Sequence, residues 1–273
     1  MKKLFTVAVL LAMTLATMAQ DEKTNIVVAE FQNKSNSGQV ACNNLRQEIV
    51  SGLIGTERLT VVETASLGEM PKAKNDLLLF LHDMSIPYYL EGTLNSVDTK
   101  SGTLSGRTVY EATINYTLTL IETETGVTKT SETYKDSYTV GDTRDEAILK
   151  AIEYAKKRMT RFVDEQFKVA AVIKALDEVD PKKGVKSCYI SVGSDAGITK
   201  GQIFEVFSKT EIAGEKIDKK IGEIRVEEVL SGTLSKCVVK NGGVDIKNNF
   251  DKQVQMTVLT RAKKPKPWEL LTK

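Results

Sequence analysis

The sequence predicts an α+β protein: an N-terminal mixed-sheet α/β domain with helices packed on it, followed by a small C-terminal all-β barrel or sandwich domain. Two observations predict this fold class. In the first part of the 273-residue chain, strand-like and helix-like spacings of apolar residues alternate, which places helices on a mixed sheet. After about residue 168, short apolar runs recur between glycine-rich turns without a good helix, which is typical of small all-β domains.

The first elements follow from apolar runs and their period. In the proposed helices apolar residues recur about every 3.6 positions, whereas the strands are short continuous or alternating runs. Gly92 inside a strand indicates a bulge or a close approach of another group. The expected elements are a strand at 25–31, a helix at 39–54, a strand at 59–62, a helix at 75–84 and a strand at 87–97.

A long antiparallel hairpin is expected next. Residues 109–121 alternate apolar side chains with threonine and asparagine, so one face is buried and the other is wet, and residues 127–138 return beside them. Residues 98–108 are expected to be a short polar link before this pair. Thr143 and Glu146 have the spacing of a capping box, which begins a helix with an apolar stripe.

The C-terminal unit is expected to contain short strands only. The composition changes near residues 167–170, so residues 20–167 and 168–261 are each expected to fold alone, with residues 262–273 as a basic, proline-containing tail. The strand candidates are residues 171–176, 186–192, 202–207, 222–229, 234–240 and 255–260.

Residues 1–19 have the features of a cleaved signal peptide. Lys2 and Lys3 precede an apolar run over residues 4–16, and small residues lead to Ala19. A helix of this run would span roughly 20 Å, short of the ~30 Å hydrocarbon core of a bilayer. No cysteine lies near the cut, so a lipid anchor is not predicted. We therefore expect a periplasmic or secreted protein whose formal charge falls from +2 to zero on cleavage.

Composition excludes several function classes. The chain has 38 basic and 36 acidic residues, which argues against nucleic acid as a partner. One histidine and three cysteines exclude a multi-histidine metal site or a zinc ribbon. His82 lacks the neighbouring motif of a serine nucleophile and is expected to be structural, at the surface or half-buried. We expect no catalytic residues, no cofactor and no metal.

Four acidic residues in or near turns raise the alternative of glycoside hydrolysis, which uses paired carboxylates. Nothing in the sequence places two of them across a cleft, and acidic residues this dense in turns are usually solvated. They are Glu122, Glu124, Asp136 and Asp142.

The three cysteines are all expected to be buried. Cys42 lies on the apolar face of its helix, which favours a free thiol. Cys188 and Cys237 share strand faces with aliphatic residues and would point into the β-unit core. An oxidising compartment would permit a Cys188–Cys237 disulfide, and two free buried thiols are the alternative.

The basic tail at residues 262–273 has two possible interpretations. Prolines hold it extended, so it is either a solvated, frayed end or a contact with a partner or an anionic surface, anchored by the single tryptophan. The candidate contact residues are Arg261, Lys263, Lys264, Lys266 and Trp268.

Several segments of the N-terminal unit resemble the curli-assembly CsgG family, a superfamily that includes lipoprotein activators of penicillin-binding proteins. They are Asn-Ile-Val-Val-Ala-Glu-Phe at 25–31, Tyr-Tyr-Leu-Glu-Gly-Thr-Leu at 88–94, Leu-Thr-Leu-Ile-Glu-Thr-Glu-Thr-Gly at 118–126 and Asp-Glu-Ala at 145–147. The resemblance covers roughly residues 25–165, with the segments in the family's order.

The C-terminal unit resembles the C-terminal domain of flagellar assembly protein T. The likeness lies in residues 192–206, Val-Gly-Ser-Asp-Ala-Gly-Ile-Thr-Lys-Gly-Gln-Ile-Phe-Glu-Val, and continues in Ile-Gly-Glu-Ile-Arg-Val at 221–226. Gly193, Gly197 and Gly201 suit tight turns between strands, and no Gly-Lys-Ser/Thr sequence opens a helix as in a phosphate loop.

Together the residues and the resemblance imply an exported, non-enzymatic cell-envelope protein, an assembly or partner-binding factor. The expected partner is an envelope protein or a cell-wall component; peripheral contact with the outer membrane and homo-oligomerisation are further expectations. A subunit of an outer-membrane secretion channel is the first alternative, disfavoured by the short link at 98–108 and the missing lipid anchor. An envelope hydrolase is the second.

Overall fold

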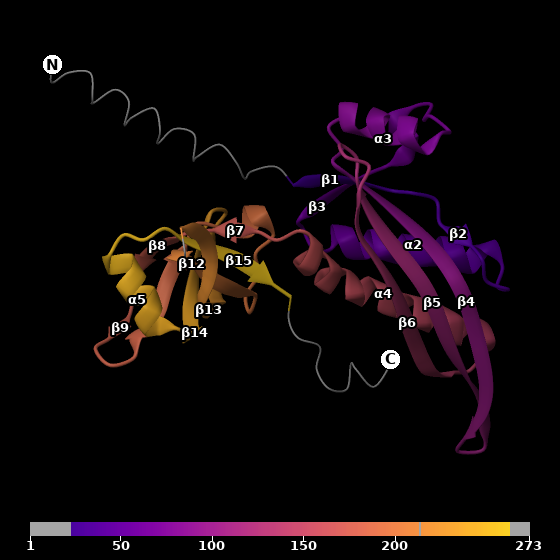
Figure 1. Cartoon of the computed structure of the whole chain (residues 1–273). Coiled ribbons are helices and arrows are strands. Elements are labelled where there is room, and N and C mark those ends of the chain that lie inside the picture. Colours follow the sequence, from indigo (N-terminus) through magenta and orange to yellow (C-terminus); the bar gives the residue numbers. More distant parts are fainter. Residues whose placement is uncertain (1–22, 213, 263–273) are drawn as a thin grey trace.

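The computed structural model describes residues 23–212 and 214–262, which form two sheets with separate cores (Figure 1). The first sheet is mixed and carries helices, and the second is antiparallel and nearly closed into a barrel. The predicted α+β fold class is therefore confirmed. The signal peptide predicted at 1–19 and the tail from residue 263 onward lie outside the described residues.

The first sheet has the strand order β3-β1-β4-β5-β6. β1 runs parallel to both of its neighbours, and β5 runs antiparallel to both β4 and β6. A short strand, β2 (Gln32–Asn33), also pairs with β4. The main strands are β1 (Thr24–Val28), β3 (Leu59–Val62), β4 (Tyr88–Leu104), β5 (Arg107–Glu122) and β6 (Thr128–Gly141).

Two helices cover one face of this sheet. α2 (Gln39–Ile54) and α4 (Arg144–Gln166) lie side by side against it (Figure 1), and the alternating apolar residues of β5 pack beneath them. On the other face, α3 (Lys74–Asp83) packs around Val27 and follows a 3-10 turn, Thr64–Leu67. No helix of the described residues is long and apolar enough to cross a membrane.

Two local sequence signals are confirmed by their contacts. Gly92 lies against the ring of Phe31, where an added Cβ would come within 2.3 Å of the ring carbons, so the strand needs glycine there. At the start of α4, the Thr143 hydroxyl accepts a hydrogen bond from the Glu146 amide at 3.1 Å. The Glu146 carboxylate accepts one at 2.7 Å from the amide of Asp142, one residue before the N-cap, so the contact is a close variant of the capping box.

The expectation that residues 98–108 form a short link is wrong. β4 and β5 are 17 and 16 residues long and stay paired to Leu104 and Arg107, so the segment is the outer part of one long hairpin. Its tip is a two-residue turn in which Ser105 and Gly106 both have positive φ, 52° and 79°. No helix of the described chain covers this part, so its residues are polar and the apolar alternation that marks a strand is missing.

The second sheet has the order β7-β15-β12-β13-β14-β11-β8. Its two outermost strands follow each other in the chain with only Val172 between them, so the sheet curls towards closure. A small separate ribbon pairs β9 (Val179–Asp180) with β10 (Gly184–Val185). The strands of the sheet are β7 (Ala170–Ala171), β8 (Ile173–Leu176), β11 (Ser187–Ile190), β12 (Ile203–Ile212), β13 (Glu215–Ser231), β14 (Leu234–Asn241) and β15 (Met256–Arg261).

The C-terminal unit also contains helices, contrary to the expectation of strands alone. α5 (Gly243–Asp251) packs on the barrel through the buried Ile246, and a 3-10 turn spans Ser194–Ala196. α5 begins at Gly243, directly after Gly242, and has one fully buried side chain, so neither its start nor its period resembles an ordinary amphipathic helix.

The hydrophobic cores of the two sheets have no residue in common. Phe167 packs against the first core, whereas Val169 belongs to the second. The change from one core to the other thus lies between Phe167 and Val169, and the domain boundary stays a prediction. That each unit folds alone stays a prediction.

Candidate functional site

One face of the first sheet, opposite α2 and α4, is lined by hydroxyl groups. Side chains of β5 and β6 on this face bond in cross-strand pairs, each 2.9 Å between oxygen atoms. α3 contacts this face only near β1 and the start of β4, so the paired hydroxyls form an ordered polar surface. The pairs are Thr113 with Ser137, Thr117 with Thr133, and Thr119 with Ser131.

Among the described residues, β6 is the last strand of this sheet, and its 14 residues have a neighbouring strand on one side only. In an antiparallel pair, alternate residues direct both backbone groups away from the neighbour. The carbonyl of Lys135 faces this free edge, since it accepts a hydrogen bond of 3.2 Å from Arg158 on α4. By the same alternation, Ser131 and Thr133 present backbone groups at the edge, and both residues are exposed.

The opposite side of β6 holds a buried polar cluster. Asp136 is 2% exposed, accepts a hydrogen bond of 2.9 Å from the Tyr116 hydroxyl and forms an ion pair with Arg158. Burial raises the pKa of the Asp136 carboxyl, and Arg158 opposes that shift. The expectation that Asp136 is solvated is therefore wrong, because its side chain points under α4. Glu124 and Asp142 are exposed, and Glu122 is partly exposed.

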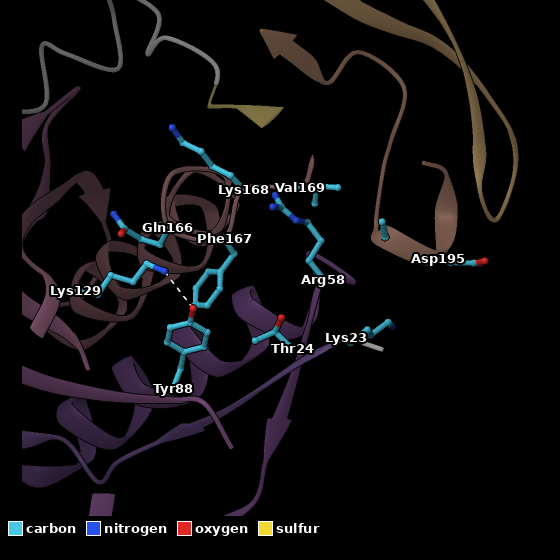
Figure 2. Close-up of a pocket in the computed structure, with 11 residues that line it drawn as sticks. Lys23, Thr24, Arg58, Tyr88, Lys129, Gln166, Phe167, Lys168, Val169 and Asp195 are labelled. Carbon is cyan, nitrogen blue, oxygen red and sulfur yellow. Dashed lines mark hydrogen bonds between the residues drawn. The ribbon is translucent and has the colours of Figure 1, made fainter. Parts of the chain in front are cut away.

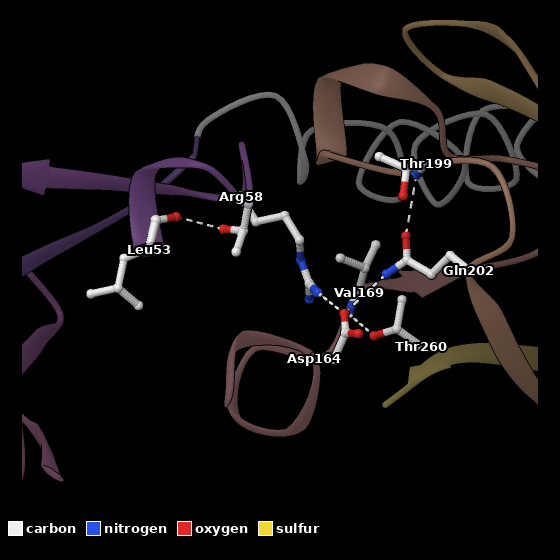
Figure 3. Close-up of polar contacts among 8 residues, drawn as sticks. Leu53, Arg58, Asp164, Val169, Thr199, Gln202 and Thr260 are labelled. Carbon is white, nitrogen blue, oxygen red and sulfur yellow. Dashed lines mark hydrogen bonds and ion pairs between the residues drawn. The ribbon is translucent and has the colours of Figure 1, made fainter. Parts of the chain in front are cut away.

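A second polar network joins the two units (Figure 3). Arg58 Nη1, just before β3, lies 2.6 Å from Asp164 Oδ1 on α4. The same oxygen accepts a hydrogen bond of 3.1 Å from the Gln202 side chain, which precedes β12. Nearby, the Val169 amide donates to the Thr260 hydroxyl at 2.9 Å. Three distant parts of the chain thus meet at one carboxylate.

A cavity of about 230 Å³ lies beside this network (Figure 2). Tyr88 and Phe167 form one wall, with ring centroids 4.9 Å apart in an edge-to-face arrangement. Lys129 donates a hydrogen bond of 3.2 Å to the Tyr88 hydroxyl. The lining residues are Lys23, Thr24, Arg58, Tyr88, Lys129, Gln166, Phe167, Lys168, Val169, Asp195 and Ala196.

The structure brings the two C-terminal cysteines together. Cys188 on β11 and Cys237 on β14 are directly opposite in the strand register, and both are fully buried. Their thiols are free in this structure, and the Cys188–Cys237 disulfide stays a prediction. Burial raises the pKa of Cys188 to about 12 and that of Cys237 as well. Cys42 is a buried free thiol, as predicted.

We expect the folded protein to be inert to a thiol reagent at pH about 8, because the three cysteine side chains are 0% exposed and burial disfavours the thiolate. Labelling followed by mass spectrometry checks this. Rapid modification of the folded chain would contradict it. Labelling in denaturant without reductant then tests whether the disulfide exists. One reactive thiol per chain would mean that Cys188 and Cys237 are bonded, and three would mean that no disulfide is present.

Arg261, a predicted partner contact, is engaged within its own sheet. It lies at the end of β15, and its Nη1 is 2.7 Å from the Glu223 carboxylate. Lys263, Lys264, Lys266 and Trp268 lie outside the described residues. The contact role of these five residues stays a prediction.

Two further observations concern chemistry. His82 is exposed on α3, as predicted for a structural residue. Within residues 23–212 and 214–262, no group of three or more His, Cys, Asp and Glu side chains could hold a metal ion.

Comparisons with known proteins give structural likenesses only. No protein-family model and no curated protein matches the chain. The PelC dodecamer from Paraburkholderia phytofirmans matches 52% of this chain and 86% of its own, at 14% identity and a TM-score of 0.34. The hypothetical protein CT253 from Chlamydia trachomatis matches 52% and 94%, at 10% identity and a TM-score of 0.37. The LpoB C-terminal domain from Escherichia coli matches 46% and 91%, at 13% identity and a TM-score of 0.31. Likenesses this distant carry no functional conclusion.

Proposed function

We propose that this protein is an exported, non-enzymatic partner-binding or assembly factor of the cell envelope, and that it holds its partner at the free edge of β6. The observation that carries the proposal is that edge: a 14-residue strand that has one neighbour in the described part of the chain, beside a polar sheet face that α2 and α4 leave uncovered. An extended partner segment can add to such an edge through backbone hydrogen bonds.

The edge is only partly protected. Natural proteins blunt free edges with lysine, proline, bulges or covering elements. Here Lys135 lies on the strand, and Arg158 occupies its outward carbonyl. Ser131 and Thr133, which precede Lys135, are exposed and carry small side chains, so their backbone groups are accessible to an added strand. The accessible stretch of the β6 edge is therefore short, which favours binding of a specific partner over non-specific aggregation.

The cellular setting of this proposal comes from the sequence. The signal-peptide pattern over residues 1–19 supports export to the periplasm, and the resemblance to the CsgG family over residues 25–165 supports an envelope partner, either a protein or a cell-wall component. A second copy of the chain is a further partner that the same edge would accept, because edge pairing is open to identical strands.

The positions of the carboxylate side chains argue against a hydrolase. Among the described residues Asp136 is the buried one, and it is bonded to Tyr116 and Arg158 beneath α4, where no substrate would reach it. A pair of carboxylates that flank a bound sugar, as glycoside hydrolysis requires, would have to face a cleft.

The proposal is tested by Thr133→Pro with Thr133→Ala as its matched control. Proline removes an outward N–H that does not bond to β5, and it is tolerated on edge strands. We expect captured partner, measured by affinity purification from envelope extract, to fall about tenfold for Thr133→Pro, since one or two backbone hydrogen bonds are lost. Thr133→Ala should bind as the unaltered protein does. Equal capture by folded Thr133→Pro, checked by circular dichroism, would reject the edge as the binding site.

A further inference from the structure

The cavity between the two units has an excess of positive charge. Lys23, Arg58, Lys129 and Lys168 line it, and Asp195 is the one acidic side chain among its lining residues in the described chain (Figure 2). Lys23 and Lys168 are exposed and lie at the rim, whereas Arg58 is buried in the wall. Positive charge gathered in a concave site with low-dielectric walls attracts anions.

Arg58 supplies the second observation. Its side chain is 5% exposed and its Nη1 is bonded to Asp164, but Nε and Nη2 are buried and have no hydrogen-bond partner among the described residues. Burial lowers the pKa of Arg58, and Asp164 only partly offsets this shift. Burying a guanidinium with two unbonded N–H donors costs folding free energy unless another acceptor forms hydrogen bonds with them.

The opposite wall is aromatic and holds a positioned lysine. The ammonium of Lys129 lies 4.8 Å from the ring centroid of Tyr88 and 5.7 Å from that of Phe167. It also forms an ion pair with Glu122 at 3.9 Å, a partly exposed pair of the kind that contributes little energy. Lys129 is therefore held over apolar rings at the cavity wall.

We propose that this cavity binds a phosphate group, either of a free phosphorylated compound or of a phospholipid headgroup. Three lysines and an arginine favour an anion with several oxygen atoms over a single carboxylate, because guanidinium and ammonium groups can donate to different phosphate oxygens. The Tyr88 and Phe167 rings would pack against the carbon part of the ligand. This proposal goes beyond partner binding at β6 and does not depend on it.

Inorganic phosphate is the first probe, measured by isothermal titration calorimetry on the mature chain. The test variant is Lys23→Gln with Lys168→Gln, both at exposed positions. The matched control is Lys174→Gln with Lys209→Gln, which removes two exposed lysines that do not line the cavity. We expect one phosphate per chain, about tenfold weaker binding in the test variant, and a change of less than about twofold in the control.

A second arm separates the two sources of phosphate. Vesicles of phosphatidylcholine with and without phosphatidylglycerol are sedimented with the protein and both variants. If the unaltered protein binds the anionic vesicles and the Lys23/Lys168 variant does not, the ligand is a lipid headgroup. If the protein binds inorganic phosphate but not the vesicles, the ligand is a free phosphorylated compound. Binding of neither probe, an equal loss in the control variant, or acetate binding as tight as phosphate would overturn the proposal.

Discussion

Replacing Asp164 by alanine is expected to lower the free energy of unfolding by about 3–5 kcal/mol, the cost of removing one partner of a buried ion pair. Arg58, whose side chain is 5% exposed, would keep its charge without a counterion, and Gln202 would lose the acceptor that it bonds at 3.1 Å. Denaturant unfolding followed by circular dichroism measures the change.

The neighbouring Glu165 is the control for this substitution. It pairs with Arg161 one turn earlier on α4, at 2.7 Å, and both side chains are substantially exposed. Glu165→Ala should therefore cost well under 1 kcal/mol. If Asp164→Ala were no more destabilising than Glu165→Ala, the network between the two units would contribute nothing to stability.

The Asp164 variant also bears on the predicted domains. If residues 20–167 and 168–261 fold alone, weakening their junction should separate the unfolding into two transitions, since each unit keeps its own core. A single transition at a lower denaturant concentration would mean that the two sheets fold as one unit.

The second large effect is expected at Asp136. Asp136→Ala should lower the free energy of unfolding by about 2–4 kcal/mol, because it leaves the fully buried Tyr116 hydroxyl without its acceptor and Arg158 without its counterion. Asp136→Asn should cost less, since an amide oxygen can still accept from Tyr116. Equal losses in the two variants would contradict this assignment.

The same residue gives a pH dependence with a definite sign. Burial raises the pKa of Asp136 above 3.8 in the folded state. The folded protein therefore binds this proton more tightly than the unfolded chain does, which favours folding at low pH and is lost as the pH rises through the raised value. Relative to Asp136→Asn, the unaltered protein should gain stability as the pH falls from about 7 to about 4 in urea titrations.

Local patterns predicted the elements whose residues alternate between a core and water. The apolar alternation of β5 exists because its inner face lies under α2 and α4, and the capping box of α4 is a contact between residues three positions apart. No described helix covers the outer part of the β4–β5 hairpin, so apolar and polar residues do not alternate in its sequence. α5 was missed because a single residue, Ile246, is its buried contact.

The site residues were harder to predict because they meet across the chain. Arg58 and Asp164 are 106 residues apart, and no local spacing relates them. Asp136 did carry a signal: it shares the inner face of β6 with Tyr134, opposite the apolar residues of β5. In a strand rich in Thr, Ser and Lys, however, a buried acidic residue is indistinguishable from a solvated one without its partner Arg158.

The claim that a partner binds at the free edge of β6 is tested most directly by site-specific photo-crosslinking in the cells that export the protein. A photoreactive residue is placed at Thr133 on the edge, or at Leu149, which is 46% exposed on α4 and serves as the comparison position. The account predicts a discrete crosslinked partner from position 133 and none from position 149. Adducts from position 149 alone, or equally from both positions, would contradict it.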